Sequence, residues 1–368
     1  MRCRSQAGTT VRGPLRWPMA LVGAAVVLVA QATAAVAQPD APTTERSTPP
    51  LFSTADPLDL MITADFRALQ GDRRESPDRA ALLTVAAGDR TVGVGANVRT
   101  RGAFRLDPGN CSFPPLRLDV RGAEAVGTVL EGQDDLKLVS SCRPGRSAYD
   151  DLVWLEYFVY RSYARLTDDA FQVRLVRLTF VDTAEESPRQ TRMGFLIEDA
   201  DALAERRGAR LFELEEGKNL PPAAFEPIAR TRNAVFQYMI GNTDWSEVAA
   251  HNVEILELNG GATVVPYDFD FSGLVDAPYS VPAADLNLSN VRERLYRGWC
   301  VNAFTVRAVL DGFRAARSDI LTLWAGAVEL DERTRRRATG YLEDFFGAIE
   351  TDERAERRFL RDCREMPG

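Results

Sequence analysis

The spacing of apolar residues changes partway along this chain, and that change most constrains its fold. Up to about residue 200, apolar residues recur at every second position within short runs, as in VRLVRLTFVD at 173–182, which is typical of strands. From about residue 201 onward they recur at the three-and-four spacing of amphipathic helices. We therefore expect an α+β protein with a strand-rich first part and a mostly helical second part.

The expected elements follow from this pattern. One strong helix, at 149–166, interrupts the first part, because Leu152, Leu155, Val159 and Leu166 share one helical face. The other helices are predicted near 222–240, 302–316, 318–329 and 332–350. Strands are predicted at 58–64, 82–86, 92–99, 116–120, 136–140, 173–182, 193–198, 253–258 and 263–267. A β-rich lobe (57–200) with one main helix, followed by a helical lobe (201–368), is the order of two-lobed protein kinases, and we predict a kinase-like fold.

The N-terminus has the pattern of a cleaved secretory signal. Four Arg residues precede the apolar run MALVGAAVVLVA at 19–30, and a small-x-small pattern ends at Ala37. We predict a signal peptide over 1–37 and a flexible Pro- and Thr-rich leader over 38–56. No later segment is long and apolar enough to span a membrane. The mature protein is therefore expected to be periplasmic or secreted, without a transmembrane segment.

Cysteine usage agrees with export. Beyond the signal the chain holds Cys111, Cys142, Cys300 and Cys363, and an even number in an exported protein favours disulfides. Three pairings are possible. We favour Cys111–Cys142 with Cys300–Cys363, since each pair then lies within one half of the chain.

Charge and composition exclude several classes of function. Removing residues 1–37 takes away four Arg and no acidic residue, which changes the net charge from −8 to −12. A chain this acidic is a poor non-specific binder of nucleic acid. His251 is the only His, so sites that need two His ligands are excluded. Lys137 and Lys218 are the only Lys residues.

The stretches TDWSEVAAHN and PYDFDFSG carry the candidate chemistry. They place Asp244, Asn252, Asp268 and Asp270 in loops around two short strands. Phosphoryl transfer needs a carboxylate that accepts or orients the proton of the attacking hydroxyl. It also needs oxygen ligands that hold Mg²⁺ against the phosphates. We predict Asp244 as the base, with Asn252, Asp268 and Asp270 as metal ligands. We interpret His251 as a residue that orders the loop.

The first part of the chain supplies nucleotide-binding candidates. Lys137 lies in the predicted strand LKLVSS, and Glu156 lies on the helix that follows, an order that suits a Lys–Glu pair beside ATP phosphates. Glu198, in GFLIEDAD, ends a strand where an adenine-contacting segment would lie. Arg101, in VRTRGAF, lies beside Gly102 at a turn suited to face phosphate.

These motifs together resemble the spore coat protein H-like (CotH) family of atypical secreted kinases. The matching pieces are R-x-R-G, L-K-L-V, G-F-L-I-E, T-D-W…H-N and P-Y-D-F-D, over about residues 90–275. The resemblance implies a kinase-like fold and the use of ATP with Mg²⁺ or Mn²⁺. It also implies phosphorylation of Ser or Thr on an exported protein acceptor, with the roles assigned above.

Two alternatives stay open at this point. No clear G-x-G-x-x-G phosphate loop is present, which is compatible with a catalytically inactive relative that acts as a binding or envelope-assembly module. The paired carboxylates could also serve a carbohydrate-active hydrolase, whose chemistry depends on their separation.

Overall fold

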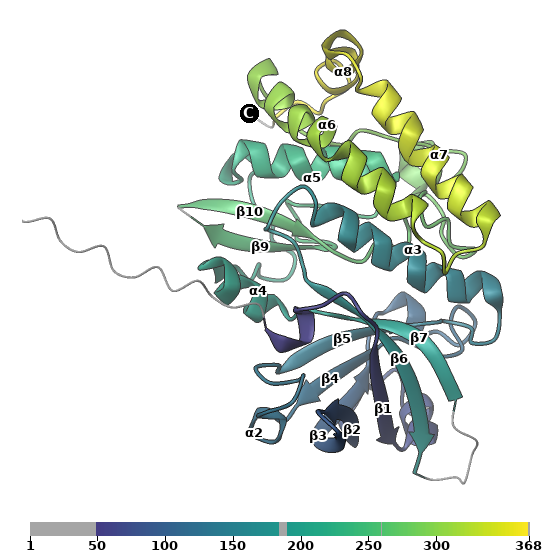
Figure 1. Ribbon diagram of the computed structural model, residues 1–368. Helices are drawn as coiled ribbons and strands as arrows, with labels where there is room; N and C mark the ends of the chain where they lie inside the picture. The colour runs from purple at the N-terminus through teal and green to yellow at the C-terminus, as the bar shows by residue number, and fades with distance from the viewer. Residues whose placement is uncertain (1–48, 184–189, 259, 367–368) are drawn as a thin grey trace, which may run out of the picture. The chain divides into compact units, whose positions relative to one another are not determined.

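Strands of the first part and helices of the second part form the two halves of the fold, which we describe from a computed structural model (Figure 1). The structure describes residues 49–183, 190–258 and 260–366. The predicted signal peptide (1–37) and the start of the predicted leader lie outside the described residues.

The strands match the predicted positions closely. They are β1 (Leu58–Ala64), β2 (Arg79–Ala87), β3 (Arg90–Thr100), β4 (Leu116–Val120), β5 (Asp135–Ser140), β6 (Val173–Asp182), β7 (Gln190–Ile197), β8 (Arg210–Leu211), β9 (Val253–Leu258) and β10 (Gly261–Pro266). Of these, the two-residue strand β8 was not predicted.

The α-helices are α1 (Phe66–Gly71), α2 (Gly122–Ala125), α3 (Ser147–Tyr163), α4 (Ala200–Arg207), α5 (Pro227–Ile240), α6 (Ala303–Ala325), α7 (Glu332–Ala348) and α8 (Asp352–Phe359). Short 3₁₀ helices occur at η1 (Pro50–Phe52), η2 (Phe104–Leu106), η3 (Pro222–Ala224) and η4 (Ala284–Leu286).

The first seven strands close into a barrel in the order β1-β2-β3-β4-β5-β7-β6. Closure depends on β1, which pairs antiparallel with β2 and parallel with β6, so that Leu60 lies opposite Leu178. The mixture of strands and helices agrees with the expected α+β composition. The predicted two-lobed kinase-like fold is wrong, because a closed seven-stranded barrel is not the strand arrangement of such a lobe. Local alternation predicts strands, but it does not determine which edge strands meet.

The barrel interior is filled by alternate residues of its strands. Leu60 and Ile62 of β1 and Val176 and Leu178 of β6 are almost fully buried in this core. Leu175, the residue before Val176 on β6, belongs instead to the core shared with the helices. The two faces of the strand therefore serve two different cores, as strand geometry requires.

Helix α3 lies against the barrel strands β5, β6 and β7 on one side and against α6 on the other (Figure 1). Its buried residues join those of α5, α6 and α7 in one large apolar core. A single helix, α6, replaces the two predicted at 302–316 and 318–329. Phe313, Ala316, Ile320 and Trp324 are buried on one continuous helical face, and no Gly or Pro interrupts them.

A second, smaller sheet has the order β10-β9-β8, with β8 before α5 in the chain and β9 and β10 after it. Strands β9 and β10 form an antiparallel hairpin in which Pro266 lies opposite Val253. Val253, Ile255 and Val264 form a small core with Phe225. Because the hairpin aligns the start of β9 with the end of β10, the segments before β9 and after β10 are brought side by side.

Both favoured disulfides are confirmed: Cys111 pairs with Cys142, and Cys300 pairs with Cys363. Disulfides persist in oxidising compartments, so both bonds fit an extracellular protein. Within the described ranges, no helix has the length and apolar character needed to cross a membrane.

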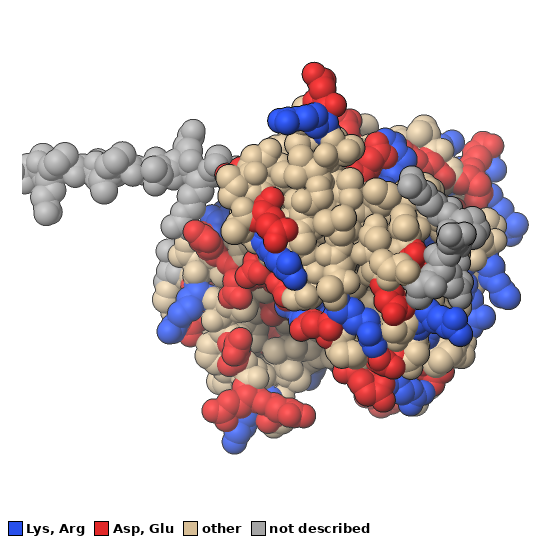
Figure 2. Space-filling model, turned by 90° about the horizontal axis from the view of Figure 1, so that it is seen from below, with Lys and Arg blue, Asp and Glu red and all other residues tan. Residues whose placement is uncertain are grey.

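The face seen from below the view of Figure 1 carries interspersed charges. Acidic and basic side chains alternate around a broad area of other residues (Figure 2). This face therefore presents no field of a single sign.

Candidate functional site

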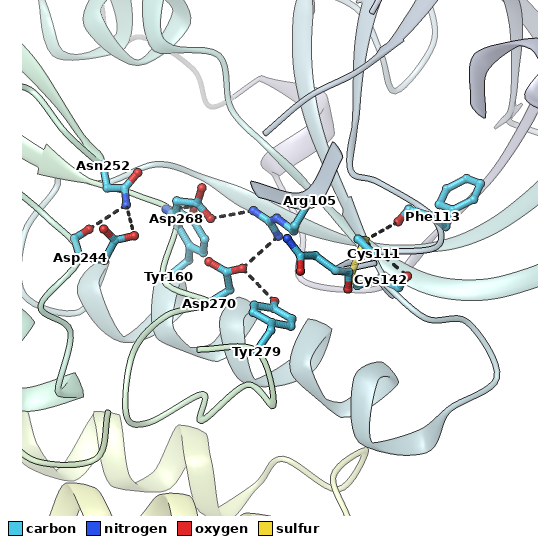
Figure 3. Close-up of polar contacts among 11 residues, drawn as sticks. Arg105, Cys111, Phe113, Cys142, Tyr160, Asp244, Asn252, Asp268, Asp270 and Tyr279 are labelled. Carbon is cyan, nitrogen blue, oxygen red and sulfur yellow. Dashed lines mark hydrogen bonds and ion pairs between the residues drawn. A yellow bond between two sulfur atoms is a disulfide. The ribbon is translucent and has the colours of Figure 1, made fainter. Parts of the chain in front are cut away.

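The loop between α5 and β9 brings Asp244 and Asn252 together (Figure 3), and His251 of the same loop also contacts Asp244. Asn252 Nδ2 donates hydrogen bonds to the backbone oxygen of Asp244 at 2.7 Å and to its Oδ2 at 3.1 Å. His251 Nε2 lies 2.9 Å from Asp244 Oδ1, and this hydrogen bond raises the pKa of His251. Both carboxylate oxygens of Asp244 are thus held in place, while its side chain keeps 43% exposure. An oriented, solvent-accessible carboxylate is what a base needs.

Local backbone conformation supports this arrangement. Asn252 has a φ of 53°, in the left-handed region that Asn tolerates better than most residues. The backbone carbonyl oxygen of Asn252 accepts a hydrogen bond from the Tyr267 backbone N–H at 3.0 Å. The Asp244 backbone N–H donates to Asn242 Oδ1 at 3.0 Å. The residue types found in the loop are therefore those that its turns require.

Asp268 and Asp270 follow β10 directly. Arg105 contacts both: its Nη2 lies 2.8 Å from Asp268 Oδ1, and its Nη1 lies 3.5 Å from Asp270 Oδ2 (Figure 3). The Tyr279 hydroxyl donates to Asp270 Oδ2 at 2.8 Å. The backbone N–H of Asp268, which has a φ of 57°, donates to the Tyr160 hydroxyl at 2.9 Å. Residues from the barrel, α3 and the second half therefore meet at one loop.

The predicted base and the predicted metal ligands converge on one place. The β9–β10 hairpin places Asn252, just before β9, next to Tyr267, just after β10. Asp268 is close enough to His251 for its charge to contribute to the raised pKa of that His. Sequence order alone could not establish this convergence, since 24 residues separate Asp244 from Asp268 in the printed sequence.

Burial makes this cluster electrostatically unusual. Burial, with the nearby Asp270, raises the pKa of Glu156 to about 8. Burial also raises the pKa of Asp270 to about 7, against the opposing charge of Arg105. Asp268 differs, because Arg105 and Arg101 overcome the effect of burial and lower its pKa. Perturbed titration of neighbouring carboxyl groups is typical of functional sites, although structural clusters also show it.

Lys137 lies on β5 at the wall of a cavity of about 600 Å³. Its Nζ is 3.6 Å from Glu254 Oε1 and 4.3 Å from the centre of the Tyr267 ring. Burial lowers the pKa of Lys137, while Glu254 opposes this effect. The cavity is also lined by Arg117, Asp199, Val253 and Lys218. Its volume is in the range of small-molecule sites.

The expected Lys137–Glu156 pair is replaced by two other arrangements. Lys137 forms its ion pair with Glu254, and Glu156 lies in the buried cluster with Arg101, Arg105 and Asp270. The predicted order of strand and helix is correct. That order does not determine the directions of the Lys137 and Glu156 side chains, which reach different partners. The charge of Arg101 acts on both Lys137 and Asp268, and it lowers the pKa of each.

Glu198 has a structural position. It is buried, and both of its carboxylate oxygens contact Arg206, at 2.8 and 2.9 Å. It also accepts a hydrogen bond from the Gln172 backbone N–H at 3.0 Å. Through these contacts the Glu198 carboxylate joins α4 to the segment before β6. A contact to a nucleotide would have to come from the neighbouring residues Asp199 and Ala200, which line the same cavity as Lys137.

The donor atoms suit a hard cation such as Mg²⁺ or Mn²⁺. Asp268 and Asp270 offer carboxylate oxygens, and Asn252 donates through Nδ2, which leaves its Oδ1 available. Among the described residues, no three His, Cys, Asp or Glu side chains gather as a group that could hold a metal. Arg105 also contacts both carboxylates. The residues therefore fit the cation by donor chemistry, provided that Arg105 releases the oxygens it holds.

Sequence reasoning missed several residues of this site. Arg105 lies four residues after Arg101 in the chain, but nothing in the pattern indicated that it would reach Asp268. Tyr160 could have been found, because it lies four residues after Glu156 and therefore on the same face of α3. Tyr279 and Glu254 carried no signal beyond their nearness to the motifs in the chain.

Glu247 lies in the same loop as Asp244, and we expect it to make the free energy of unfolding depend on pH. Burial raises its pKa to about 7, with Arg230 opposing. An acid whose folded-state pKa is raised stabilises the fold below its unfolded pKa, near 4.5, and loses that contribution as pH rises through about 7. Glu247→Gln should therefore be roughly 3 kcal/mol more stable than wild type at pH 8 and similar to it at pH 4. Urea unfolding at both pH values measures this. A constant difference across pH would contradict the assignment.

No model of a known protein family matches this chain, and no curated protein matches it in sequence. The resemblance to CotH-type kinases is therefore one of short motifs only.

Proposed function

We propose that this protein is an exported phosphotransferase that moves the γ-phosphoryl group of ATP to a Ser or Thr hydroxyl of a protein acceptor. The observation that carries the proposal is the convergence of Asp244, Asn252 and Asp268 beside the cavity that Lys137 lines. The disulfides support export. The motif resemblance to CotH-type kinases supports the same chemistry, without the kinase-like fold.

The acceptor hydroxyl would approach Asp244. Its oxygen forms the new bond to the γ-phosphorus while the bond to the β–γ bridging oxygen breaks and ADP leaves. The hydroxyl proton passes to Asp244, whose two oxygens His251 and Asn252 hold in place. Asp268, Asp270 and Asn252 would hold a Mg²⁺ or Mn²⁺ ion, which when bound would neutralise charge on the phosphate oxygens.

The phosphates would lie toward Lys137 and Arg101. Lys137 Nζ lies 3.6 Å from Glu254 Oε1, which is beyond hydrogen-bonding distance. The Nε of Arg101 is buried without a hydrogen-bond partner among the described residues. A triphosphate supplies the oxygen acceptors that these cations lack, and charge-assisted hydrogen bonds of this kind are strong.

Nucleotide binding tests the first half of the proposal. Lys137→Met should weaken ATP binding in the presence of Mn²⁺ by about tenfold, since it removes one charge-assisted contact. The melting temperature measured against ATP concentration gives the affinity, because a ligand that binds the native state stabilises it. The matched control is Lys218→Met, which removes the only other Lys, from an exposed position at the cavity wall. Equal losses in both variants would contradict a specific role for Lys137.

Transfer itself is measured by incubating the purified protein with γ-labelled ATP and Mn²⁺ or Mg²⁺. Label on the protein that survives denaturation and requires the metal is the expected result. If no label appears and ATP does not raise the melting temperature, the transferase proposal fails.

One observation favours the inactive-module alternative. Arg105 holds the two carboxylates that the metal would need, so the arrangement as it stands resembles a neutralised site. A hydrolase is not favoured, because Asp268 and Asp270 both contact the guanidinium of Arg105, at 2.8 and 3.5 Å, whereas a glycosidase needs its two carboxyl groups to flank the scissile bond.

A further inference from the structure

Arg105 is the residue of the site that the predicted roles leave unused. It is buried, with 8% of its side chain exposed, yet it carries a full charge into the loop that follows β10. Its two terminal nitrogens point to carboxylates of different residues, Asp268 and Asp270 (Figure 3). A buried guanidinium that bridges two carboxylates neutralises charge that would otherwise be costly to bury.

A divalent cation would use oxygen atoms of the same two carboxylates. Mg²⁺ binds oxygen ligands at about 2.0–2.1 Å, and Arg105 lies 2.8 Å from Asp268 Oδ1 and 3.5 Å from Asp270 Oδ2. A cation bound there would stand within a few Å of the guanidinium, and the two positive charges would repel each other. Arg105 and a cation therefore compete for the negative charge of these carboxylates.

A disulfide at Cys111 fixes the C-terminal end of the segment that carries Arg105. Arg105 lies in η2, within the connection from β3 to β4. The disulfide Cys111–Cys142 joins this connection to the residues just after β5, and the Phe113 backbone N–H donates to the Cys142 carbonyl at 3.1 Å. The disulfide therefore limits how far Arg105 can withdraw.

Aromatic contacts hold the same segment on the acidic loop. The ring of Phe104, next to Arg105, lies 5.2 Å from that of Phe271 and 5.6 Å from that of Tyr279, centre to centre. Tyr279 also donates to Asp270. These contacts and the ion pairs connect the same two segments, so a displacement of the Arg105 backbone away from the carboxylates would also shift Phe104, which is 41% exposed.

We propose that Arg105 is a positioning residue that competes with the divalent cation for Asp268 and Asp270, and so sets the cation affinity of the site. The inference rests on the proposed function in one respect, namely that these two carboxylates hold the cation. In this proposal a residue of the barrel, Arg105, controls cation binding at Asp268 and Asp270, which lie in the second half of the chain.

The test is the affinity for Mn²⁺ alone, measured from the electron paramagnetic resonance signal of free Mn²⁺. Arg105→Gln should bind Mn²⁺ at least about tenfold more tightly than wild type, because the competing charge is gone. The matched control is Arg177→Gln, which removes an Arg–Asp pair from the barrel surface, where Arg177 contacts Asp59 at 2.7 Å. Its Mn²⁺ affinity should equal that of wild type. Adding Asp268→Asn to Arg105→Gln should abolish the gain.

A second variant keeps the proposal testable if Arg105→Gln does not fold. Cys111→Ser/Cys142→Ser releases the segment that carries Arg105 while leaving Arg105 itself in place. It should tighten Mn²⁺ binding in the same direction, by a smaller factor. The matched control, Cys300→Ser/Cys363→Ser, removes the disulfide that lies elsewhere in the chain and should leave Mn²⁺ affinity unchanged.

The outcomes separate this inference from the proposed function. Unchanged or weaker Mn²⁺ binding by Arg105→Gln, or equal changes in the two disulfide variants, overturns the role of Arg105 even if the wild type transfers phosphate. Tighter Mn²⁺ binding by Arg105→Gln, with no phosphate transfer by any form of the protein, supports the role of Arg105 and rejects the transferase.

Discussion

Asp268→Asn is expected to reduce metal-dependent phosphate transfer from ATP by about 10³-fold or more. The substitution removes the carboxylate charge that would hold the cation, and electrostatic stabilisation of the transferring phosphoryl group depends on that cation. It also removes one partner of the buried pair with Arg105. Asn keeps the size of the side chain and an oxygen acceptor for Arg105, so most of the local packing should persist. The measurement is the initial rate of label incorporation from γ-labelled ATP.

Stability must be measured beside the rate, because breaking a buried ion pair can cost several kcal/mol. A melting temperature well above the assay temperature shows that lost activity is not lost folding. Asp59→Asn is the matched control, since it removes an Asp that pairs with Arg177 at the barrel surface and is 72% exposed. Transfer by Asp268→Asn at the rate of Asp59→Asn would show that Asp268 has no part in the reaction.

Trp324→Ala is expected to lower the free energy of unfolding by about 3–5 kcal/mol, the range for large-to-small changes in cores. Trp324 is fully buried at the contact between α6 and α3. Its Nε1 donates to Ser162 Oγ at 2.8 Å, and its ring lies 5.6 Å from that of Phe158. Because small domains are stable by only about 5–15 kcal/mol, this loss is a large fraction of the total.

Urea unfolding followed by circular dichroism measures the effect of Trp324→Ala as a shift in midpoint at constant slope. Phe304→Ala, on the same helix but 79% exposed, should change stability by less than about 0.5 kcal/mol. A loss below about 1.5 kcal/mol for Trp324→Ala would mean that α3 and α6 do not pack as described.

The strands and the long helices could be predicted because their signals are local. The alternation in 173–182 defines β6 at both ends, and the apolar face of 149–166 identifies α3. Helix α6 was divided into two predicted helices, although its buried face continues through Ala316 and Ile320. Disulfide pairing could also be predicted, because separation along the chain favoured one of only three possibilities.

The candidate site was predicted where its residues are close in sequence and missed where they are distant. Asp244 and Asn252 belong to one loop, and their hydrogen bonds follow from turn chemistry. Arg105 lies 163 positions from Asp268, so no local pattern relates them. The Lys137–Glu156 pair failed for the same reason: strand and helix were correct, but the directions of the two side chains depend on packing between distant elements.

The sequence by itself determined most of the strands, the positions of the long helices and the Asp244–Asn252 loop, and it favoured the cysteine pairs that form, because each depends on spacing along the chain. Only the tertiary structure decided that β1 meets β6 to close a barrel, which overturned the two-lobed prediction. It also decided that Arg105 reaches Asp268 and Asp270. These contacts form when apolar faces are buried against one another, and burial is a property of the whole chain that local periodicity does not specify.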